Sequence, residues 1–472
     1  AGQHLAWGYV DMPPLTALTA QVARTLFNDS IVGIHLIPAL AGAGLVLLTG
    51  AIVRELGGKW FAQALAGLSV VVAGSYLMSD SYLSMNAMEP LIWMGCVLIL
   101  IRMVKTGNTR LWLAFGVLAG VGLLNKHTML VFGAAVTAGI LLTSTRKLMG
   151  NRWFFLGGTL ALLIFLPNLI WMIQHNFPHL EQLANIRRNQ RNIQLDPLGY
   201  MVQQIIYQNP QTLPLWAGGL VYFLIHSQGK AFRFVTWTYI LALGLLLVTD
   251  GRPYYLSPIY PVLLAGGAVG FEGWLMQRRW WGWLKPAVFV LLSFSGVVSA
   301  LNVLPLLTPE QYIQYTKTIG FSQPQIENAH LNALPQLFAL RFGWPEMVAA
   351  TAKVYDSLTP EEQAKTIIFT GNYGEAGAID FFGPPYGLPK AMSGHLNYFY
   401  WGQELAPMVQ PGTIVIALGR NPDQLKPYFE SVRVAGLVHH PYAIPYENFP
   451  IYLCRGLKVP LEQLWPEVKD FS

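Results

Sequence analysis

Charged residues are scarce in this chain. Asp, Glu, Lys and Arg together make up 11% of its 472 residues, against roughly a quarter in ordinary soluble domains, whereas 53% of the residues are hydrophobic. Cysteine is nearly absent: Cys96 lies in an apolar segment and Cys454 near the C-terminal end, so we expect no disulfide. No cluster of Cys and His has the spacing of a zinc site. This composition argues against a soluble domain and favours an integral membrane protein.

The chain is instead rich in long apolar runs. Several of them contain about 18 or more nearly uncharged residues, the length at which an α-helix crosses about 30 Å of hydrocarbon. We therefore predict an α-helical integral membrane bundle of about ten spans. The predicted spans are 31–53, 60–78, 87–104, 111–125, 127–145, 153–173, 211–226, 234–249, 254–275 and 284–304.

The few charges alternate along the chain. Every second connection between spans is basic, and short basic loops mark the cytoplasmic side of a membrane. Residues 1–30 and the chain that follows the last span then lie outside. The basic loops explain the net charge of +6, so no nucleic-acid partner is implied. The basic connections hold Arg54, Lys59, Arg102, Lys105, Arg110, Arg146, Lys147, Arg152, Lys230, Arg233, Arg278, Arg279 and Lys285.

The chain begins at Ala1, which this alternation places outside the membrane. An external start that no span precedes is unusual. We therefore expect at least one further span N-terminal to Ala1, together with any catalytic residue attached to it.

Composition divides the chain into two predicted domains. Residues 1–305 form the membrane domain, which includes an external loop and interfacial helix at 1–30 and a long polar external loop at 174–210. Residues 306–472 are richer in charge and contain no run of membrane length. Alternating strands and helices there predict an extracytoplasmic α/β domain. The predicted strands are 365–370, 413–418, 432–438 and 449–454, and the predicted helices are 345–357 and 422–430.

Two carboxylates are candidate catalytic residues. Asp11 precedes Pro13 and Pro14, whose rings stiffen the backbone and could position a carboxylate at a membrane surface. The alternative is that Asp11 caps the helix that starts near Pro14. Glu89 stands just before Pro90 at the outer end of a span, where an ionisable group is a functional candidate. The alternative is an acid in a first helical turn, stabilised by the helix dipole.

Several external cations are candidates for binding a phosphate or a sugar, because the topology rule does not ask for cations on that side. Lys126 and His127 form a tight turn between two spans, although Lys126 could also snorkel to the interface. Arg252 stands beside Tyr254 and Tyr255, which alone could belong to an interfacial aromatic belt. The remaining external cations are Arg24 and the cluster Arg187, Arg188 and Arg191, which could be a solvated helix face.

Two segments of the C-terminal domain are less specific. Gly371–Gly377 lacks both the GxGxxG spacing and a Walker lysine, so it predicts a tight strand–helix turn and not a nucleotide site. Ser393–Gly402 is aromatic with polar residues between, which fits either a sugar or core packing.

The motifs in their order resemble the polyprenyl-phosphate-sugar-dependent glycosyltransferases of the GT-C superfamily, in the bacterial branch related to dolichyl-phosphate-mannose protein mannosyltransferases and aminoarabinose transferases. The resemblance covers the whole chain. It rests on WGYVDMPPL, MNAMEPLIW, GLLNKH, PNLIWMIQHNFP, RPYYLSPIYP and YGEAGAIDFFGPPYGLP.

The resemblance implies a multi-pass protein of the bacterial inner membrane that moves a sugar from a polyprenyl-phosphate carrier to an external acceptor, with inversion. It implies no certain cofactor, although a divalent metal ion is compatible with it, and its partners are the lipid-linked donor, membrane lipids and an acceptor. Met12 replaces the lysine that aminoarabinose transferases carry after the acid, which shifts the phosphate-holding role toward Lys126, Arg252 and the 187–191 cluster. The general base of the family would precede Ala1.

Two other classes of function remain open from the sequence. A transporter or flippase would place ionisable groups near the middle of its spans, whereas these spans carry their charges at the outer rim. A catalytically inactive relative that acts in assembly would fit a chain that lacks the base.

Overall fold

The computed structural model describes residues 1–320, 327, 328 and 333–472, which form two compact units. The helical unit contains residues 1–8, 12–176 and 194–306. The second unit contains residues 9–11, 177–193 and the described residues from 307 to 472. Asp11 therefore groups with the second unit, while its chain neighbour Met12 groups with the helical unit.

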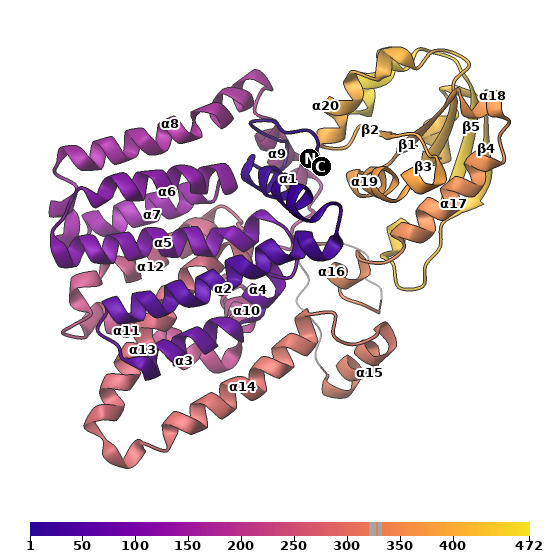
Figure 1. Ribbon diagram of the computed structural model, residues 1–472. Helices are drawn as coiled ribbons and strands as arrows, with labels where there is room; N and C mark the ends of the chain where they lie inside the picture. Colours follow the sequence, from indigo (N-terminus) through magenta and orange to yellow (C-terminus); the bar gives the residue numbers. More distant parts are fainter. Residues whose placement is uncertain (321–326, 329–332) are drawn as a thin grey trace. The chain divides into compact units, whose positions relative to one another are not determined.

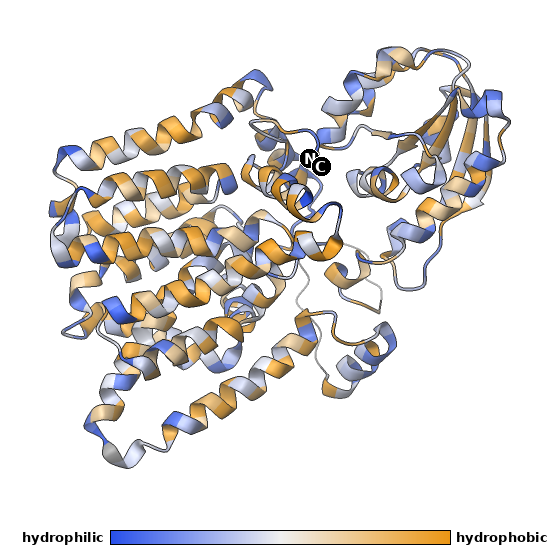
Figure 2. Ribbon diagram, in the orientation of Figure 1, coloured by the Kyte–Doolittle hydropathy of each residue, from blue (hydrophilic) through white to orange (hydrophobic). Residues whose placement is uncertain are grey.

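Helices make up the first unit, and each of the ten predicted spans holds one. Six helical segments of the described chain have the length and composition to cross a membrane. They are Ile31–Glu55 (α2), Met85–Thr106 (α5), Arg152–Gln174 (α8), Lys230–Val248 (η3 and α12), Pro253–Gln277 (η4 and α13) and Leu284–Val303 (α14). The α-helical membrane class is thus confirmed, and Figure 2 shows these helices mainly in the colour of apolar residues.

The remaining helices of this unit are shorter. The predicted span 60–78 is interrupted at Val72 and Ala73, because Ala73 takes an extended conformation that ends the helical ladder. The shorter helices are Leu15–Phe27 (α1), Trp60–Val71 (α3), Gly74–Ser79 (α4), Leu111–Asn125 (α6), Met129–Leu141 (α7), Pro197–Tyr207 (α10) and Leu213–Ile225 (α11). Helix α1 lies within residues 1–30, where the sequence predicts an interfacial helix.

Two pairs of helices in this unit pack closely against each other. Helices α6 and α8 lie side by side, as do α11 and α13 (Figure 1). Gly116 of α6 faces Gly157 of α8, and a Cβ at either position would collide with backbone of the other helix. Small residues at such a crossing let two membrane helices approach closely.

The segment 174–210, expected to be a loop, contains two helices: Pro178–Arg188 (α9) in the second unit, and α10 in the helical unit. Both begin with a proline, which suits the first turn because its missing N–H would be unpaired there. Asp196 caps α10 by accepting from the Gly199 amide at 2.9 Å. The connection between the predicted spans is therefore largely helical, and its placement outside the membrane stays a prediction.

The second unit is built on one five-stranded sheet in the order β2-β1-β3-β5-β4. Strands β2, β1 and β3 are parallel, and β5 runs antiparallel to β3 and β4. The strands are Thr366–Thr370 (β1), Ala391–Ser393 (β2), Ile414–Leu418 (β3), Phe429–Leu437 (β4) and Pro450–Leu457 (β5). Four strands match predictions, and the three-residue β2 was missed.

Helices cover both faces of this sheet. Trp344–Asp356 (α17) and Tyr373–Phe382 (α19) pack on the face that contains Ile368 and Ile416. The opposite face contains Phe369 and Val415 and a separate apolar cluster. The other helices of the unit are Pro309–Ile319 (α15), Gln336–Ala339 (α16), Pro360–Gln363 (α18), Asn397–Gln403 (α20), Pro422–Leu425 (α21) and Leu461–Leu464 (α22).

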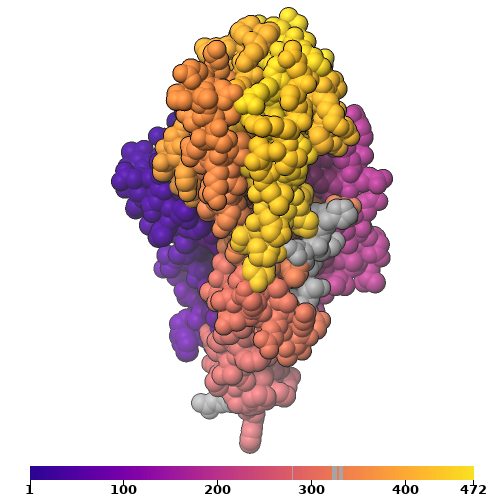
Figure 3. Space-filling view, turned by 90° about the vertical axis from the view of Figure 1, so that its right-hand side faces the viewer, coloured from indigo at the N-terminus to yellow at the C-terminus, as the bar shows by residue number. Residues whose placement is uncertain are grey.

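Two expectations for this unit have clear outcomes. Gly371 and Asn372 form the predicted tight turn between β1 and α19. The predicted helix 422–430 is wrong beyond Leu425, because Phe429 already enters β4 and its side chain joins the apolar core. In Figure 3 the C-terminal residues, in yellow, form a continuous surface beside the orange residues of the same unit.

Candidate active site

A buried ion pair forms the centre of the candidate site in the helical unit. Lys126 follows the last residue of α6, and Glu89 lies in the first half of α5. Lys126 Nζ is 2.7 Å from Glu89 Oε2, and the two side chains are 8% and 4% exposed. The Thr128 hydroxyl donates to the other carboxylate oxygen. Helices α5 and α6 run in opposite directions, which brings the start of one to the end of the other.

Aromatic rings and an amide complete the surroundings of the ammonium group. Lys126 Nζ donates to Asn86 Oδ1 at 2.9 Å and lies 4.3 Å from the ring centroid of Tyr255 and 5.5 Å from that of Tyr254. Such ring faces attract a cation most strongly where water is excluded. Two of the three N–H donors of Lys126 are thereby used, and one is left for a ligand.

The two tyrosines lie on the 3-10 helix η4 (Pro253–Ile259), which α10 holds in place. Gln204 Nε2 donates to the Pro253 carbonyl at 2.8 Å, and the Tyr200 hydroxyl donates to the Arg252 carbonyl at 3.4 Å. Arg252 is half-buried, and its Nη1 lies 3.5 Å from the Tyr254 hydroxyl. The sequence-predicted residues Glu89, Lys126, Arg252, Tyr254 and Tyr255 therefore belong to one cluster.

His127 faces a different set of groups in the same unit. Its Nε2 is 3.2 Å from Asn168 Oδ1 on α8, and Asn168 Nδ2 donates to the Trp7 carbonyl at 2.6 Å. The N-terminal loop that contains Trp7 is thus tied to α8 through Asn168. His127 thus supports this loop contact through Asn168.

The structure contradicts the alternative explanations of Glu89, as an acid in a first helical turn, and of Lys126, as a snorkelling side chain. Glu89 is not in the first turn of α5, which begins at Met85 and holds no acid there, so the helix dipole does not explain it. Lys126 does not snorkel to an interface, because its ammonium group is buried against Glu89. The pairing itself was missed by the sequence reasoning, which treated the two residues separately.

Asp11 lies in the second unit within a polar cluster of its own. Asn397 Nδ2 donates to Asp11 Oδ1 at 3.3 Å, and Asn397 Oδ1 accepts from the Val10 amide at 3.0 Å. Burial raises the pKa of Asp11 above its usual value, partly opposed by its own backbone hydrogen bond and by His179 and His395. Asp11 does not cap α1: Pro14 occupies the N-cap position and no side chain bonds there.

His179 and His395 lie near Asp11, and the sequence prediction assigned neither of them a role of its own. His179 Nδ1 lies 3.2 Å from the Val10 carbonyl, and His395 Nδ1 accepts from the Tyr373 amide at 3.1 Å. Burial lowers the pKa of both imidazoles. Sequence offered only a weak signal, since His395 stands in the Ser393–Gly402 segment assigned equally to a sugar site or to the core. Its neighbours Ser393 and Asn397 are buried.

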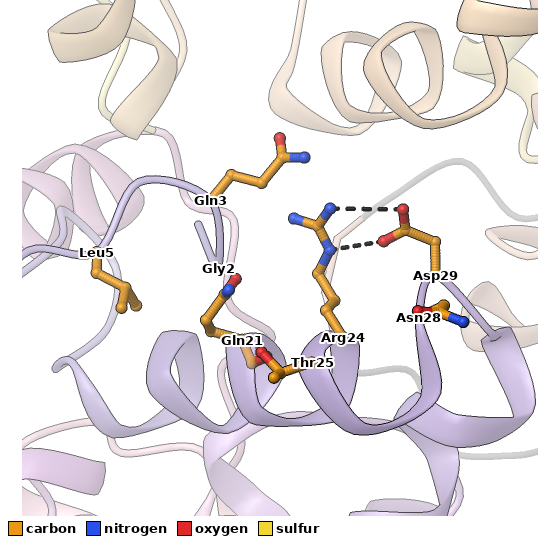
Figure 4. Close-up of a pocket in the computed structure, with 8 residues that line it drawn as sticks. All are labelled: Gly2, Gln3, Leu5, Gln21, Arg24, Thr25, Asn28 and Asp29. Carbon is orange, nitrogen blue, oxygen red and sulfur yellow. Dashed lines mark hydrogen bonds and ion pairs between the residues drawn. The ribbon is translucent and has the colours of Figure 1, made fainter.

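The arginines predicted to lie outside the membrane have varied surroundings. Arg187 and Arg188 occupy the last turn of α9 and are exposed, and Arg191 Nε pairs with Glu327 Oε2 at 3.0 Å. Arg24 Nε pairs with Asp29 at 2.6 Å and lines an open polar pocket of about 560 Å³ together with Gln3 and Gln21 (Figure 4). Each of these cations lies outside the Lys126 cluster.

Chemically, the Lys126 cluster can hold an anion, and the Asp11 cluster can hold or release a proton. A phosphate would gain charge-assisted contacts to Lys126 and Arg252. A carboxyl of raised pKa is better suited to accept a proton near neutral pH. Within the described residues, no group of three or more His, Cys, Asp or Glu side chains is placed to hold a metal ion.

Comparisons with known proteins bear on the fold. Residues 11–171 match the model of a family described as dolichyl-phosphate-mannose-protein mannosyltransferase. No curated protein sequence matches the chain.

Two crystal structures of ArnT from Cupriavidus metallidurans are similar in fold. The apo structure has a TM-score of 0.56 and the structure bound to undecaprenyl phosphate has 0.53. In both cases the identity is 14%, and the match covers 94% of this chain and 88% of ArnT. The family model and the shared fold together confirm the resemblance to the GT-C superfamily that the sequence motifs predict.

Proposed function

We propose that this protein is a membrane glycosyltransferase that takes a sugar from a polyprenyl-phosphate carrier. The observation that carries the proposal is the cluster of Lys126, Glu89, Arg252 and the two tyrosines, which supplies positive charge at the ends of helices. The family match and the ArnT structure with undecaprenyl phosphate support this class of donor.

We propose that the cluster and the C-terminal domain lie on the extracytoplasmic side. Arg102 and Lys105 pair with Glu55 at 2.9 and 2.7 Å at the other end of α5 from Glu89. Cations at that end are typical of the cytoplasmic side. The opposite end of α5, which holds the candidate site, then faces outward.

Cysteine labelling tests this orientation. Glu404 is exposed in the second unit, and Ser144 is exposed between α7 and α8 as a cytoplasmic control, whereas the native Cys96 and Cys454 are buried. A membrane-impermeant maleimide should label Glu404→Cys on intact cells and Ser144→Cys only after the membrane is opened. The reverse pattern would move the site to the cytoplasmic side.

The proposed reaction is a direct displacement at the anomeric carbon of the sugar. The acceptor oxygen bonds to that carbon while the bond from the carbon to the phosphate oxygen breaks, so the configuration inverts. The phosphate leaves with the electron pair, and Lys126 and Arg252 stabilise its growing charge. A carboxylate accepts the proton of the acceptor hydroxyl, and Asp11 is the candidate that this chain offers beside a base that would precede Ala1. Glu89 positions Lys126 and does not touch the sugar.

Transfer by the purified protein decides the function. Full-length protein in nanodiscs receives polyprenyl phosphates that carry radiolabelled sugars, with membrane extracts as the acceptor source. Release of polyprenyl phosphate together with a labelled product supports the proposal. Movement of the intact lipid-linked sugar across the membrane, without cleavage of the sugar–phosphate bond, would replace it with a flippase.

A further inference from the structure

The second unit contains an apolar cavity that the proposed reaction does not use. Its volume is about 330 Å³, and it lies on the sheet face opposite α17 and α19. Strand residues form its floor, and the segments around α21 and α22 close its sides. The apolar residues that line it include Ile367, Phe369, Val415, Leu425, Leu457 and Leu461.

One cation stands in the wall of this cavity. Arg420 follows β3, after a turn at Gly419 whose φ of +57° favours glycine. The guanidinium lies 5.0 Å from the ring centroid of Phe369, and Nη2 reaches the Thr370 carbonyl only at 3.4 Å. Its Nε is buried and has no hydrogen-bond partner. A buried donor without a partner costs free energy, and an acceptor in the cavity would relieve that cost.

The charge of Arg420 is not neutralised nearby. No carboxylate of the described chain lies within ion-pair distance of it, and the carboxyls whose charges reach it are Glu375 and Asp470. Burial raises the pKa of Glu375 to about 8, so this group is mostly protonated at neutral pH. An anion in the cavity would therefore meet the charge of Arg420, while the one carboxylate among the lining residues, Glu467, accepts from the Tyr428 hydroxyl at 2.9 Å.

The position of Arg420 is one where α/β proteins often bind ligands. Strand β1 has β2 on one side and β3 on the other. The connection that follows β1 therefore leads to one side of the sheet, and the connection that follows β2 crosses back to the other side. The loops at the carboxyl ends of β1 and β3 diverge at such a point and leave room for a ligand. Arg420 lies in the loop after β3, and Phe369 is near the end of β1.

Size limits the ligand. A volume of about 330 Å³ holds roughly eleven units of the size of a water molecule, at about 30 Å³ each. A saturated carboxylate of eight to ten carbons has about that many heavy atoms. Its chain matches the apolar walls, and its head matches Arg420.

We propose that this cavity binds an aliphatic chain that ends in an anion, with the head group on Arg420 and the chain against Phe369, Val415 and Leu457. The mouth is formed by exposed residues that include Gln424. Free fatty acids and anionic phospholipids both offer this chemistry.

The probe is decanoate with a ¹³C-labelled carboxyl group. Its binding to the full chain in phosphatidylcholine nanodiscs is measured by ¹³C NMR, with empty nanodiscs as the blank. Saturable binding above the blank is expected. Each methylene removed, from decanoate to octanoate to hexanoate, should weaken binding about fourfold. Arg420→Gln should weaken it at least tenfold, because a charge-assisted bond is lost. Lys390→Gln removes an exposed cation outside the cavity and should leave binding unchanged.

Two further variants protect the test against misfolding. Val415→Phe fills the floor, and Gln424→Trp narrows the mouth from an exposed position that tolerates large side chains. Both should abolish saturable binding while thermal unfolding shows a folded chain. Binding equal to the blank, or unchanged binding in Arg420→Gln, would overturn the proposal. Replacing a third of the lipid by phosphatidylglycerol separates the sources: competition identifies a phospholipid, and unchanged affinity identifies a free fatty acid.

Discussion

Buried acids are treated differently in the two units. In the helical unit, Glu89 is held by Lys126, and Glu272 accepts from the Lys59 and Ala62 amides at 2.7 and 3.2 Å. In the second unit, Asp11, Glu375 and Glu447 form no ion pair with any Lys or Arg of the described chain. Their burial raises the pKa of each. The two acids named in the helical unit thus meet an opposite charge or backbone donors. The three named in the second unit meet no cation, and burial shifts them toward the neutral form, although Glu375 also accepts from the Gly371 and Asn372 amides at 2.7 and 3.4 Å.

The difference suits the chemistry proposed for each cluster. A cation paired with a buried carboxylate is fixed in position and can hold a phosphate. A carboxyl without a cation changes its protonation more readily and can exchange a proton. The two arrangements make opposite predictions for the same kind of substitution, from acid to amide.

Glu89→Gln should have the largest effect on stability. The variant leaves Lys126 charged and buried without its partner, and breaking a buried pair in this way costs roughly 3–5 kcal/mol. Thermal unfolding in nanodiscs, followed by tryptophan fluorescence, should show a large fall in melting temperature. The double variant Glu89→Gln with Lys126→Met removes both charges and should recover most of the loss. An unchanged melting temperature in the single variant would show that the pair contributes little.

Glu447→Gln should raise the free energy of unfolding at high pH, whereas Glu89→Gln lowers it. Burial raises the pKa of Glu447 to about 7, so the folded state binds its proton more tightly than the unfolded state does. Stability therefore falls as the pH rises from about 4.5 to 7, by on the order of 3 kcal/mol at about 1.4 kcal/mol per pKa unit. The amide cannot ionise, so the variant should lose this dependence.

Below pH 5 the same variant should be slightly less stable than the parent, because Glu447 Oε2 is buried without a partner and an NH₂ there would be unsatisfied. Plots of the free energy of unfolding against pH for the parent and the variant should cross between pH 5 and 8. Parallel plots over that range would show that the ionisation of Glu447 does not make stability depend on pH.

Asp11→Asn should lower sugar transfer about a hundredfold or more, the scale of a lost general base. Its melting temperature at neutral pH should not fall, since the amide avoids burial of a charge. In the parent, activity should decline on acidification through a pKa above the usual value for Asp. Near-normal turnover by the variant would leave Asp11 a structural residue that contacts Asn397.

Arg252→Ala should weaken binding of a short-chain polyprenyl phosphate about ten- to a hundredfold, because one charge-assisted contact contributes roughly 1.5–3 kcal/mol. Arg252→Lys should restore binding only in part, because lysine lacks the guanidinium fork. Equilibrium binding to purified variants measures this. If Arg252→Ala binds like the parent, the phosphate lies elsewhere.

Arg187→Gln and Arg188→Gln should have the smallest effects, each below about fivefold on transfer, because exposed charges contribute little. The assay is the same transfer reaction, with Arg252→Ala as the reference. A tenfold loss in either variant would make the end of α9 a headgroup site.

Local patterns predicted much of the fold but little of the site. Apolar runs located a helix in every predicted span, because burial in lipid depends on composition over one segment. They failed where three residues make β2, and where Pro178 and Pro197 start helices in a polar segment. The Glu89–Lys126 contact joins residues 37 positions apart through antiparallel packing of α5 and α6. The Asn397–Asp11 contact spans 386 positions. No local pattern encodes either distance.

The carboxylate of Glu272 also sets an order for biosynthesis. Helix α3 has only 12 residues and no capping side chain of its own. The amides at its start are satisfied from α13, which the ribosome makes about 200 residues later. Until α13 arrives, these amides need water or a chaperone as a partner, because lipid offers none. The start of α3 therefore gains these hydrogen bonds only after α13 has been translated.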